Sequence, residues 1–233
     1  MQEAFSKIVQ MFEIAFITGD RWKLYLNGLG VTLQVSFFAA VLGLLIGSTL
    51  ALMKLSAGKN GRRSIWDYIA SVYLDIIRGT PAVLQLLIMY FIILSSVRNG
   101  ILIAIISFGI NSGAYVAEIV RAGILAVDKG QTEAGRSLGL SKAQTMLYIV
   151  IPQAVKNVLP PMGNEFIVLL KETAIVGYVG LSDLTRIANQ ISSRTYEPFM
   201  PLIGAAVIYF IIIKMLTVLL GKLERRMRVS DNR

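Results

Sequence analysis

The sequence predicts an all-α membrane protein with five transmembrane helices. Hydrophobic residues make up 55% of the chain and charged residues only 16%, whereas soluble domains average about 25% charged residues. The mean hydropathy is +0.65. The apolar residues also form blocks of about 20 or more, the length that a helix needs to cross about 30 Å of hydrocarbon. These observations argue against a soluble domain and for a single transmembrane domain over residues 1–233.

The first segment, residues 1–20, is predicted to be an amphipathic helix that lies at the membrane interface. It mixes Glu3, Lys7 and Glu13 with apolar residues. It also lacks the basic start and small-residue cleavage site of a signal peptide.

Five apolar segments follow this helix. The expected spans are residues 27–53, 65–94, 101–124, 158–181 and 199–221. In the first span, Gly43 and Gly47 are four residues apart. They either admit a close helix neighbour or reflect the ordinary tolerance of glycine in membrane helices.

The second span is interrupted by Arg78-Gly79-Thr80-Pro81. We expect the helix to break at Gly79 and to restart with Thr80 as N-cap and Pro81 as the first helical residue. Such a restart directs free backbone N–H groups and the positive end of a helix dipole into the membrane. A carboxylate is the expected occupant of that position.

Lysines and arginines in the connecting segments predict the orientation. With five spans, one side carries fourteen of them: Lys54, Lys59, Arg62, Arg63, Arg121, Lys129, Arg136, Lys142, Lys156, Lys222, Arg225, Arg226, Arg228 and Arg233. The other side carries six: Lys7, Arg21, Lys23, Arg98, Arg186 and Arg194. The amino terminus is therefore expected outside and the carboxyl terminus in the cytoplasm. Because the basic excess sits in these segments, the net charge of +9 does not require nucleic acid as a partner.

Residues 125–157 form the largest cytoplasmic segment in this topology. Two capping boxes, Asp128 with Gln131 and Ser141 with Gln144, predict short helices over 129–138 and 142–149. The second helix is expected to end before Pro152. Gly139 lies between the two helices and suits a left-handed helix end. The segment is either a structured loop or a docking site for a cytoplasmic protein.

The sequence of this segment resembles the EAA motif of bacterial ABC-importer permeases. The matching residues are Glu133-Ala134-Gly135, Gly139 and Ile149-Val150-Ile151-Pro152, with Gly135 in place of alanine and Ile151 in place of leucine. The resemblance implies a coupling helix that sits in a cleft of a cytoplasmic ATPase subunit. It assigns ATPase coupling to Glu133, Ala134, Gly135, Arg136, Ser137, Leu138 and Gly139.

Three further stretches resemble the polar amino-acid branch of these permeases, the histidine, glutamine and arginine group. They are Arg78-Gly79-Thr80-Pro81, residues 111–118, and Gly163-Asn164-Glu165-Phe166 through Lys171-Glu172. The resemblance implies the type I ABC importer permease fold in a bacterial inner membrane. It also implies three protein partners: a second permease chain (identical or a close paralogue), an ATP-binding subunit and an extracytoplasmic amino-acid-binding protein.

Polar residues within the predicted spans point to a substrate path, because polar groups inside a bilayer usually face a cavity or a partner. The candidates are Gly79, Thr80, Gln85, Asn111, Ser112, Tyr115, Glu118, Asn164, Glu165 and Glu172. Asn111, Tyr115 and Glu118 share one helix face. Acidic residues outnumber basic ones among these candidates, which favours a cationic or neutral polar amino acid as the substrate. Alternatively, Asp75–Arg78, Glu118–Arg121 and Lys171–Glu172 are structural pairs that hold the helices together.

Three hypotheses of function follow. The sequence has no histidine, no cysteine and no Gly-x-x-x-x-Gly-Lys-Ser/Thr loop for ATP phosphates, so we expect no enzyme activity and no cofactor in this chain. The leading hypothesis is the permease subunit of an amino-acid importer that works by alternating access, with ATP and Mg on the partner ATPase. The alternatives are a small ion-coupled secondary amino-acid transporter, in which Glu165 or Glu172 titrates, and a membrane scaffold that only recruits a cytoplasmic protein.

Overall fold

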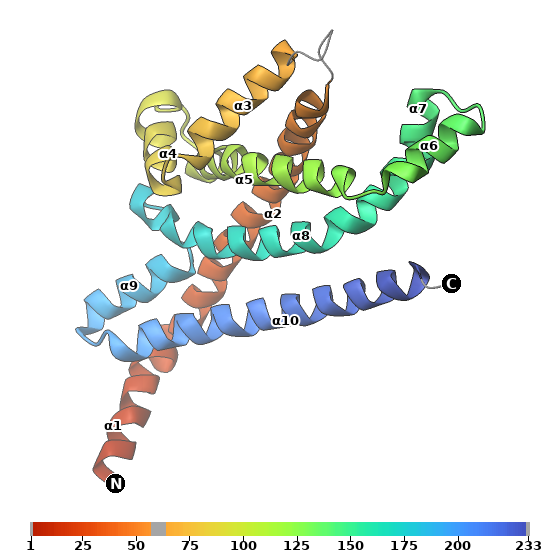
Figure 1. Cartoon of the computed structure of the whole chain (residues 1–233). Coiled ribbons are helices and arrows are strands. Elements are labelled where there is room, and N and C mark those ends of the chain that lie inside the picture. The colour runs from red at the N-terminus through yellow and green to blue at the C-terminus, as the bar shows by residue number, and fades with distance from the viewer. Residues whose placement is uncertain (1, 57–63, 232–233) are drawn as a thin grey trace.

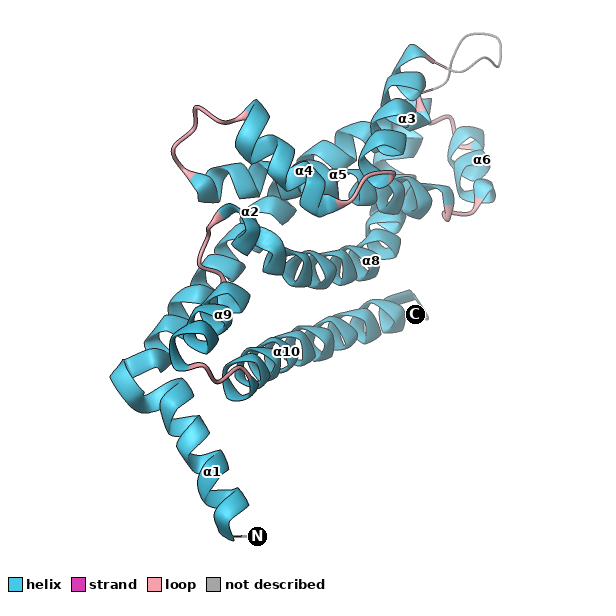
Figure 2. Ribbon diagram, turned by 90° about the vertical axis from the view of Figure 1, so that its left-hand side faces the viewer, coloured by secondary structure: helices cyan, strands magenta, loops and turns pink. Residues whose placement is uncertain are grey.

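The computed structural model describes residues 2–56 and 64–231. Within these ranges every regular element is a helix (Figures 1 and 2), which confirms the all-α prediction. Lys59, Arg62, Arg63 and Arg233, which entered the orientation argument, lie outside the described residues.

The amino-terminal part is helical and kinked. The elements are α1 (Gln2–Phe12), η1 (Glu13–Ile17), η2 (Thr18–Asp20) and α2 (Arg21–Leu55). The kink lies at Gly19 and Asp20, whose φ angles are +63° and +56°. Phe5, Ile8 and Phe12 of α1 are exposed, so α1 carries an apolar face that its own chain leaves uncovered.

Helix α2 packs closely against α5 (Gly100–Leu125). A Cβ atom at Gly47 would lie 2.5 Å from Val116 Cγ1, and one at Gly113 would lie 2.8 Å from Ile46 Cγ2. Only glycine leaves room for such contacts, so the two backbones can approach one another. The close-neighbour alternative for the first span is therefore the correct one.

The second predicted span is broken as expected. Helix α3 (Ile65–Arg78) ends at Gly79, and α4 (Ala82–Ile88) with η4 (Met89–Ile93) continues at a bend of 101°. The predicted restart is wrong by one residue, because Pro81 is the N-cap and Ala82 begins the helix. The Thr80 hydroxyl donates back to the Ile76 carbonyl at 2.9 Å, so it closes the preceding helix instead of capping the next one.

The segment predicted to be cytoplasmic contains α6 (Lys129–Ser137) and α7 (Lys142–Thr145). The predicted end before Pro152 is wrong, since α7 continues through η5 (Met146–Val150) into α8 (Ile151–Glu172). Pro152 lies in the first turn of α8, directly after the π-helical turn of η5. Pro160 and Pro161 follow inside the same helix.

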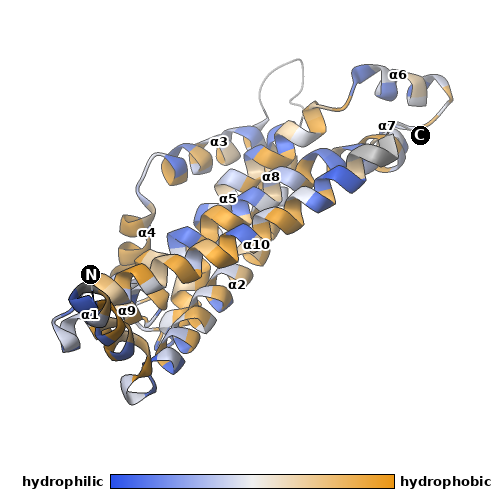
Figure 3. Ribbon diagram, turned by 90° about the horizontal axis from the view of Figure 1, so that it is seen from below, coloured by the Kyte–Doolittle hydropathy of each residue, from blue (hydrophilic) through white to orange (hydrophobic). Residues whose placement is uncertain are grey.

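The chain ends in three further elements. They are η6 (Thr173–Val179), α9 (Leu184–Thr195) and α10 (Phe199–Asp231). Helix α9 has no counterpart in the sequence prediction. The α6–α7 hairpin and the carboxyl end of α10 lie at one end of the molecule, whereas α1 and α9 lie at the other (Figures 1 and 3).

Three described segments are long and apolar enough to cross a membrane: Phe5–Leu55, Gly100–Leu125 and Phe199–Met227. The bent pair Ile65–Arg78 and Ala82–Ile93 makes a fourth if it counts as one span. Helix α8 is not among them, since polar residues such as Asn157, Asn164 and Glu165 interrupt its apolar residues. Only 11% of the apolar window of α10 is buried, and Figure 3 shows that this helix is hydrophobic over most of its length.

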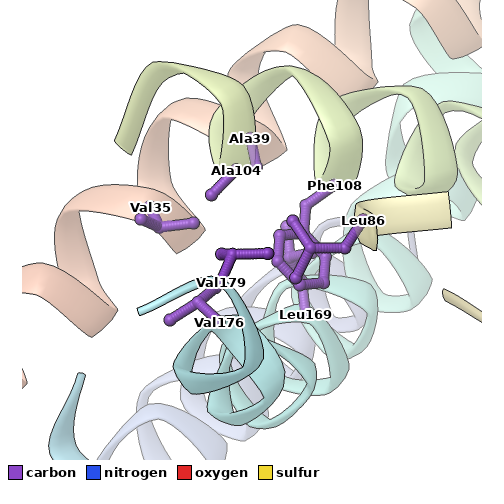
Figure 4. Packing of buried hydrophobic residues seen from close by; sticks show 8 residues of the cluster. All are labelled: Val35, Ala39, Leu86, Ala104, Phe108, Leu169, Val176 and Val179. Atoms are coloured by element: carbon purple, nitrogen blue, oxygen red, sulfur yellow. The ribbon is translucent and has the colours of Figure 1, made fainter. Parts of the chain in front are cut away.

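The main core joins five elements around Phe108 (Figure 4). Its buried residues are Val35, Ala39, Leu86, Ala104, Phe108, Leu169, Val176 and Val179. They come from α2, α4, α5, α8 and η6. This core therefore fixes the restarted helix α4 against α5 and α8, which carry most of the candidate path residues.

Candidate functional site

The broken helix is held together by the side chain of Gln85. Its Nε2 donates to the Ile77 carbonyl at 2.8 Å, the Thr80 carbonyl at 3.1 Å and Thr80 Oγ1 at 2.8 Å. These carbonyls lie at the end of α3 and in the break, where the helix itself supplies no donor. Gln85 therefore satisfies the acceptors that the break exposes.

Gln85 also links the break to α5. Its Oε1 accepts a hydrogen bond from Asn111 Nδ2 at 2.9 Å, and Asn111 is buried. Three predicted path residues, Thr80, Gln85 and Asn111, are thus brought into one hydrogen-bonded group. Gly79 ends the helix directly beside them.

A second polar contact joins α5 to α8. Ser112 Oγ donates to Glu165 Oε1 at 2.9 Å. Ser112 is buried beside Gly43 of α2, while Glu165 is half-buried. Because Asn111 and Ser112 are neighbours in sequence, one turn of α5 connects the helix break to the carboxylate of α8.

Tyr115 and Glu118 lie further along α5 and contact basic residues. The guanidinium carbon of Arg78 lies 5.7 Å from the centre of the Tyr115 ring, a cation–π distance. Glu118 Oε2 pairs with Arg121 Nη2 at 2.8 Å, which confirms the predicted pair.

The other two pairs of the structural alternative do not form. Among the described residues neither Asp75 with Arg78 nor Lys171 with Glu172 lies within ion-pair distance, and Arg78 contacts Tyr115 instead. Of the remaining candidates, Asn164 is exposed on α8 and Glu172 is half-buried at its end. The structure gives neither a hydrogen bond to another predicted path residue.

A cavity of about 320 Å³ adjoins the break. Its lining is mostly apolar, and its polar members are Thr80, Gln85 and Ser107. The sequence analysis missed Ser107, although it lies one turn before Asn111 on the same face of the helix. It also missed Tyr73, whose hydroxyl donates to the Ile110 carbonyl at 2.7 Å and holds α3 against α5.

The predicted coupling residues lie in the α6–α7 hairpin. The second capping box is confirmed, because Gln144 N donates to Ser141 Oγ and Ser141 N donates to Gln144 Oε1. The first is incomplete: Asp128 Oδ1 accepts from Gly130 N, while the Gln131 side chain accepts from Gln153. The Gln131 side chain therefore contacts α8, and the reciprocal bond of that box does not form.

Helix α6 ends in a Schellman motif at Gly139. Gly139 N donates to the Arg136 carbonyl at 3.1 Å, and Leu140 N donates to the Gly135 carbonyl at 3.2 Å. The φ angle of Gly139 is +86°, a left-handed conformation that glycine adopts without strain. The predicted left-handed helix end is confirmed.

One face of α6 is packed and the other is open. A Cβ atom at Gly135 would lie 2.7 Å from Ile149 Cδ1, so glycine here lets α6 rest on η5. The remaining predicted coupling residues are exposed: Glu133, Ala134, Arg136, Ser137, Leu138 and Gly139. Leu138 is 82% exposed, which makes it an apolar side chain presented at the tip of the hairpin.

Residues 43–229 match the family described as the binding-protein-dependent transport system inner membrane component. The chain belongs to this family. Membership confirms the resemblance seen in the sequence, and it confirms that the chain is a permease subunit of an ABC importer with several membrane spans.

Individual relatives share most of the chain. It is 42% identical over 209 residues to the arginine transport system permease protein ArtQ of Bacillus subtilis (strain 168), covering 88% of this chain and 93% of that protein. It is 36% identical over 211 residues to the glutamine transport system permease protein GlnP of Escherichia coli (strain K12), covering 88% and 94%.

Solved structures share the fold. A crystal structure of an amino acid ABC transporter with histidines matches with a TM-score of 0.80 and 47% identity, over 88% of this chain and 94% of that one. A structure of the MetNI methionine ABC transporter in an inward-facing conformation matches with a TM-score of 0.76 at 20% identity, over 88% and 96%. This permease therefore has the type I ABC importer fold.

Proposed function

We propose that this permease carries polar amino acids, cationic or neutral, across a bacterial inner membrane by alternating access. The observation that carries the proposal is the similarity over 88% of the chain to permeases named for arginine and glutamine transport. The Glu165 carboxylate, held by buried Ser112, adds a chemical reason. A half-buried carboxylate attracts an ammonium or guanidinium group more strongly than one in water does.

The substrate path in this proposal consists of the ten predicted residues around α4, α5 and α8. They are Gly79, Thr80, Gln85, Asn111, Ser112, Tyr115, Glu118, Asn164, Glu165 and Glu172. The contacts Gln85–Asn111 and Ser112–Glu165 support its central part. Coupling is assigned to residues 133–139, whose exposed side chains support a docking role.

The proposed topology has five spans in one domain, with the amino terminus outside and the carboxyl terminus in the cytoplasm. Residues 1–20 lie at the outer interface and 125–157 in the cytoplasm. The position of the α6–α7 hairpin at the end of the molecule opposite α1 and α9 supports this arrangement (Figure 1). Helix α8 would be the fourth span despite its polar residues, because Asn157 and Glu165 form hydrogen bonds with α5.

The working importer is proposed to contain two permease chains, identical or paralogous, with two ATP-binding subunits and an extracytoplasmic amino-acid-binding protein. ATP and Mg bind to the ATPase subunits, and this chain carries no cofactor. Closure of the ATPase pair would move the two coupling segments together. This movement would change the side of the membrane to which the path opens.

Reconstitution into vesicles tests the class of mechanism. The chain, with its ATPase and binding protein, is expected to take up labelled arginine or glutamine only with ATP, and an uncoupler is expected to leave uptake unchanged. If the chain alone takes up the amino acid and an uncoupler abolishes this uptake, the ion-coupled alternative is correct. Complete absence of uptake, with the ATPase still bound, would favour the scaffold.

A further inference from the structure

Helix α9 presents a continuous polar face at the end of the molecule opposite the α6–α7 hairpin. Its apolar face packs inward through Leu184, Ile187, Ala188 and Ile191, all of which are buried. The other face carries Thr185, Arg186, Asn189, Gln190, Ser193 and Arg194. Because this face carries no apolar side chain, it faces water or a polar partner and does not face lipid tails.

Two hollows lie along this face, each of about 380 Å³. They share Arg186 and Asn189 and so form one groove along α9. Tyr178, on the rim from η6, is 70% exposed. Tyrosine and arginine are the residue types that most often dominate protein interfaces.

The groove is positively charged. Its two charged lining residues are Arg186 and Arg194, and its lining includes no carboxylate. The nearest carboxylates in sequence are engaged by backbone donors: Asp183 accepts from Thr185 N and Arg186 N, and Glu197 accepts from Phe199 N. Arg186 itself is oriented by a hydrogen bond from Nη1 to the Gly177 carbonyl at 3.0 Å, which leaves its other N–H groups for a partner.

We infer that this groove is a docking surface for the extracytoplasmic binding protein, and that it receives carboxylates from that protein. The inference rests on the proposed function, which places α9 outside the membrane and requires a soluble protein to deliver the amino acid there. Charge complementarity favours an acidic partner. A helix of 12 residues is about 18 Å long, which suits one part of a larger protein interface.

The test measures ATP hydrolysis by the reconstituted complex, in vesicles of neutral lipid, as the concentration of its binding protein is raised. The double variant Arg186→Glu and Arg194→Glu is expected to need about tenfold more binding protein for half-maximal stimulation, because electrostatic steering changes association rates by tenfold or more. The shift is expected to shrink at high salt. Hydrolysis without binding protein is expected to stay unchanged.

Two controls separate the outcomes. Arg98→Glu reverses an exposed charge before α5 and outside the groove, so it is expected to behave like wild type. Arg194→Gln alone, which leaves the Arg186 hydrogen bond intact, is expected to give a smaller shift in the same direction. Equal half-maximal concentrations for wild type and the double variant would overturn the inference. So would a shift seen only with anionic lipid, since the groove would then bind headgroups. Failure of wild type to respond to any binding protein would instead overturn the proposed function.

Discussion

Gln85 and Asn111 are joined by a hydrogen bond of 2.9 Å between Oε1 of the first and Nδ2 of the second. This bond connects the break in the second span to the middle of α5. Because the Gln85 amide nitrogen also donates to three acceptors in the break, one side chain fixes both the bend and its distance from α5.

Replacing Gln85 by leucine is therefore expected to loosen the break. The Ile77 and Thr80 carbonyls and the Asn111 amide would lose their partner. Asn111 is buried, and an unsatisfied buried polar group costs about 1–3 kcal/mol. We expect a lower thermal unfolding temperature in detergent and strongly reduced uptake. The matched control is Gln10→Leu, which changes the same residue type at an exposed position of α1. Equal losses in the two variants would contradict a specific role for the break.

The Glu165 carboxylate is predicted to contribute to substrate affinity. Glu165→Gln keeps the shape of the side chain and an acceptor for Ser112 but removes the charge. Hydrogen bonds to charged groups contribute about 1.5–3 kcal/mol, so the KM for arginine uptake is expected to rise about tenfold or more. Glu3→Gln, at an exposed position of α1, is the control for loss of a carboxylate, and its KM is expected to stay unchanged. An unchanged KM in Glu165→Gln would remove Glu165 from the path.

Gly139 is predicted to be required for coupling. Valine at φ +86° is strained by about 1–2 kcal/mol or more, so Gly139→Val is expected to distort the end of α6 and to reduce co-purification of the ATPase. Gly139→Asn is the matched control, because asparagine tolerates the left-handed conformation, and it is expected to retain most binding. Full ATPase binding by the valine variant would exclude this helix end from the docking site.

The close packing of α2 against α5 is predicted to be required for thermal stability. A side chain at Gly47 would collide with Val116, and overpacking of this kind costs about 1–3 kcal/mol. Gly47→Leu is expected to lower the thermal unfolding temperature. Gly30→Leu, on the same helix with nothing within 4 Å of the added Cβ, is expected to leave it nearly unchanged. Equal unfolding temperatures in the two variants would contradict the described packing.

The fold was predictable where one local signal dominated. Long apolar blocks located the three spans that coincide with long apolar helices, residues 27–53, 101–124 and 199–221. Arg78-Gly79-Thr80-Pro81 located the break to within one residue. The error at Thr80 arose because its hydroxyl could bond forward as a cap or backward to Ile76, and only the structure shows which bond forms. Helix α9 was missed because a short polar segment between spans resembles a loop. Its signal was nevertheless present in the Asp183 N-cap and the apolar spacing of Leu184, Ile187, Ala188 and Ile191.

The candidate site was predictable as a set of residues but not as a set of contacts. Polar side chains in apolar helices singled out Gln85, Asn111, Ser112 and Glu165. Their pairing depends on tertiary packing, since Ser112 and Glu165 are 53 residues apart. The alternative ion pair of Asp75 with Arg78 does not form, and this too depends on tertiary packing. Packing places the Tyr115 ring against the Arg78 guanidinium.

We propose that this permease selects cationic or neutral polar amino acids. The most direct measurement is ATP-dependent uptake of labelled arginine, glutamine, aspartate and leucine by vesicles that contain the chain with its ATPase and binding protein. The proposed selectivity predicts uptake of arginine or glutamine, little uptake of aspartate or leucine, and reduced uptake of the preferred amino acid by Glu165→Gln at low substrate concentration. Aspartate or leucine uptake equal to that of arginine and glutamine, unaffected by Glu165→Gln, would contradict it.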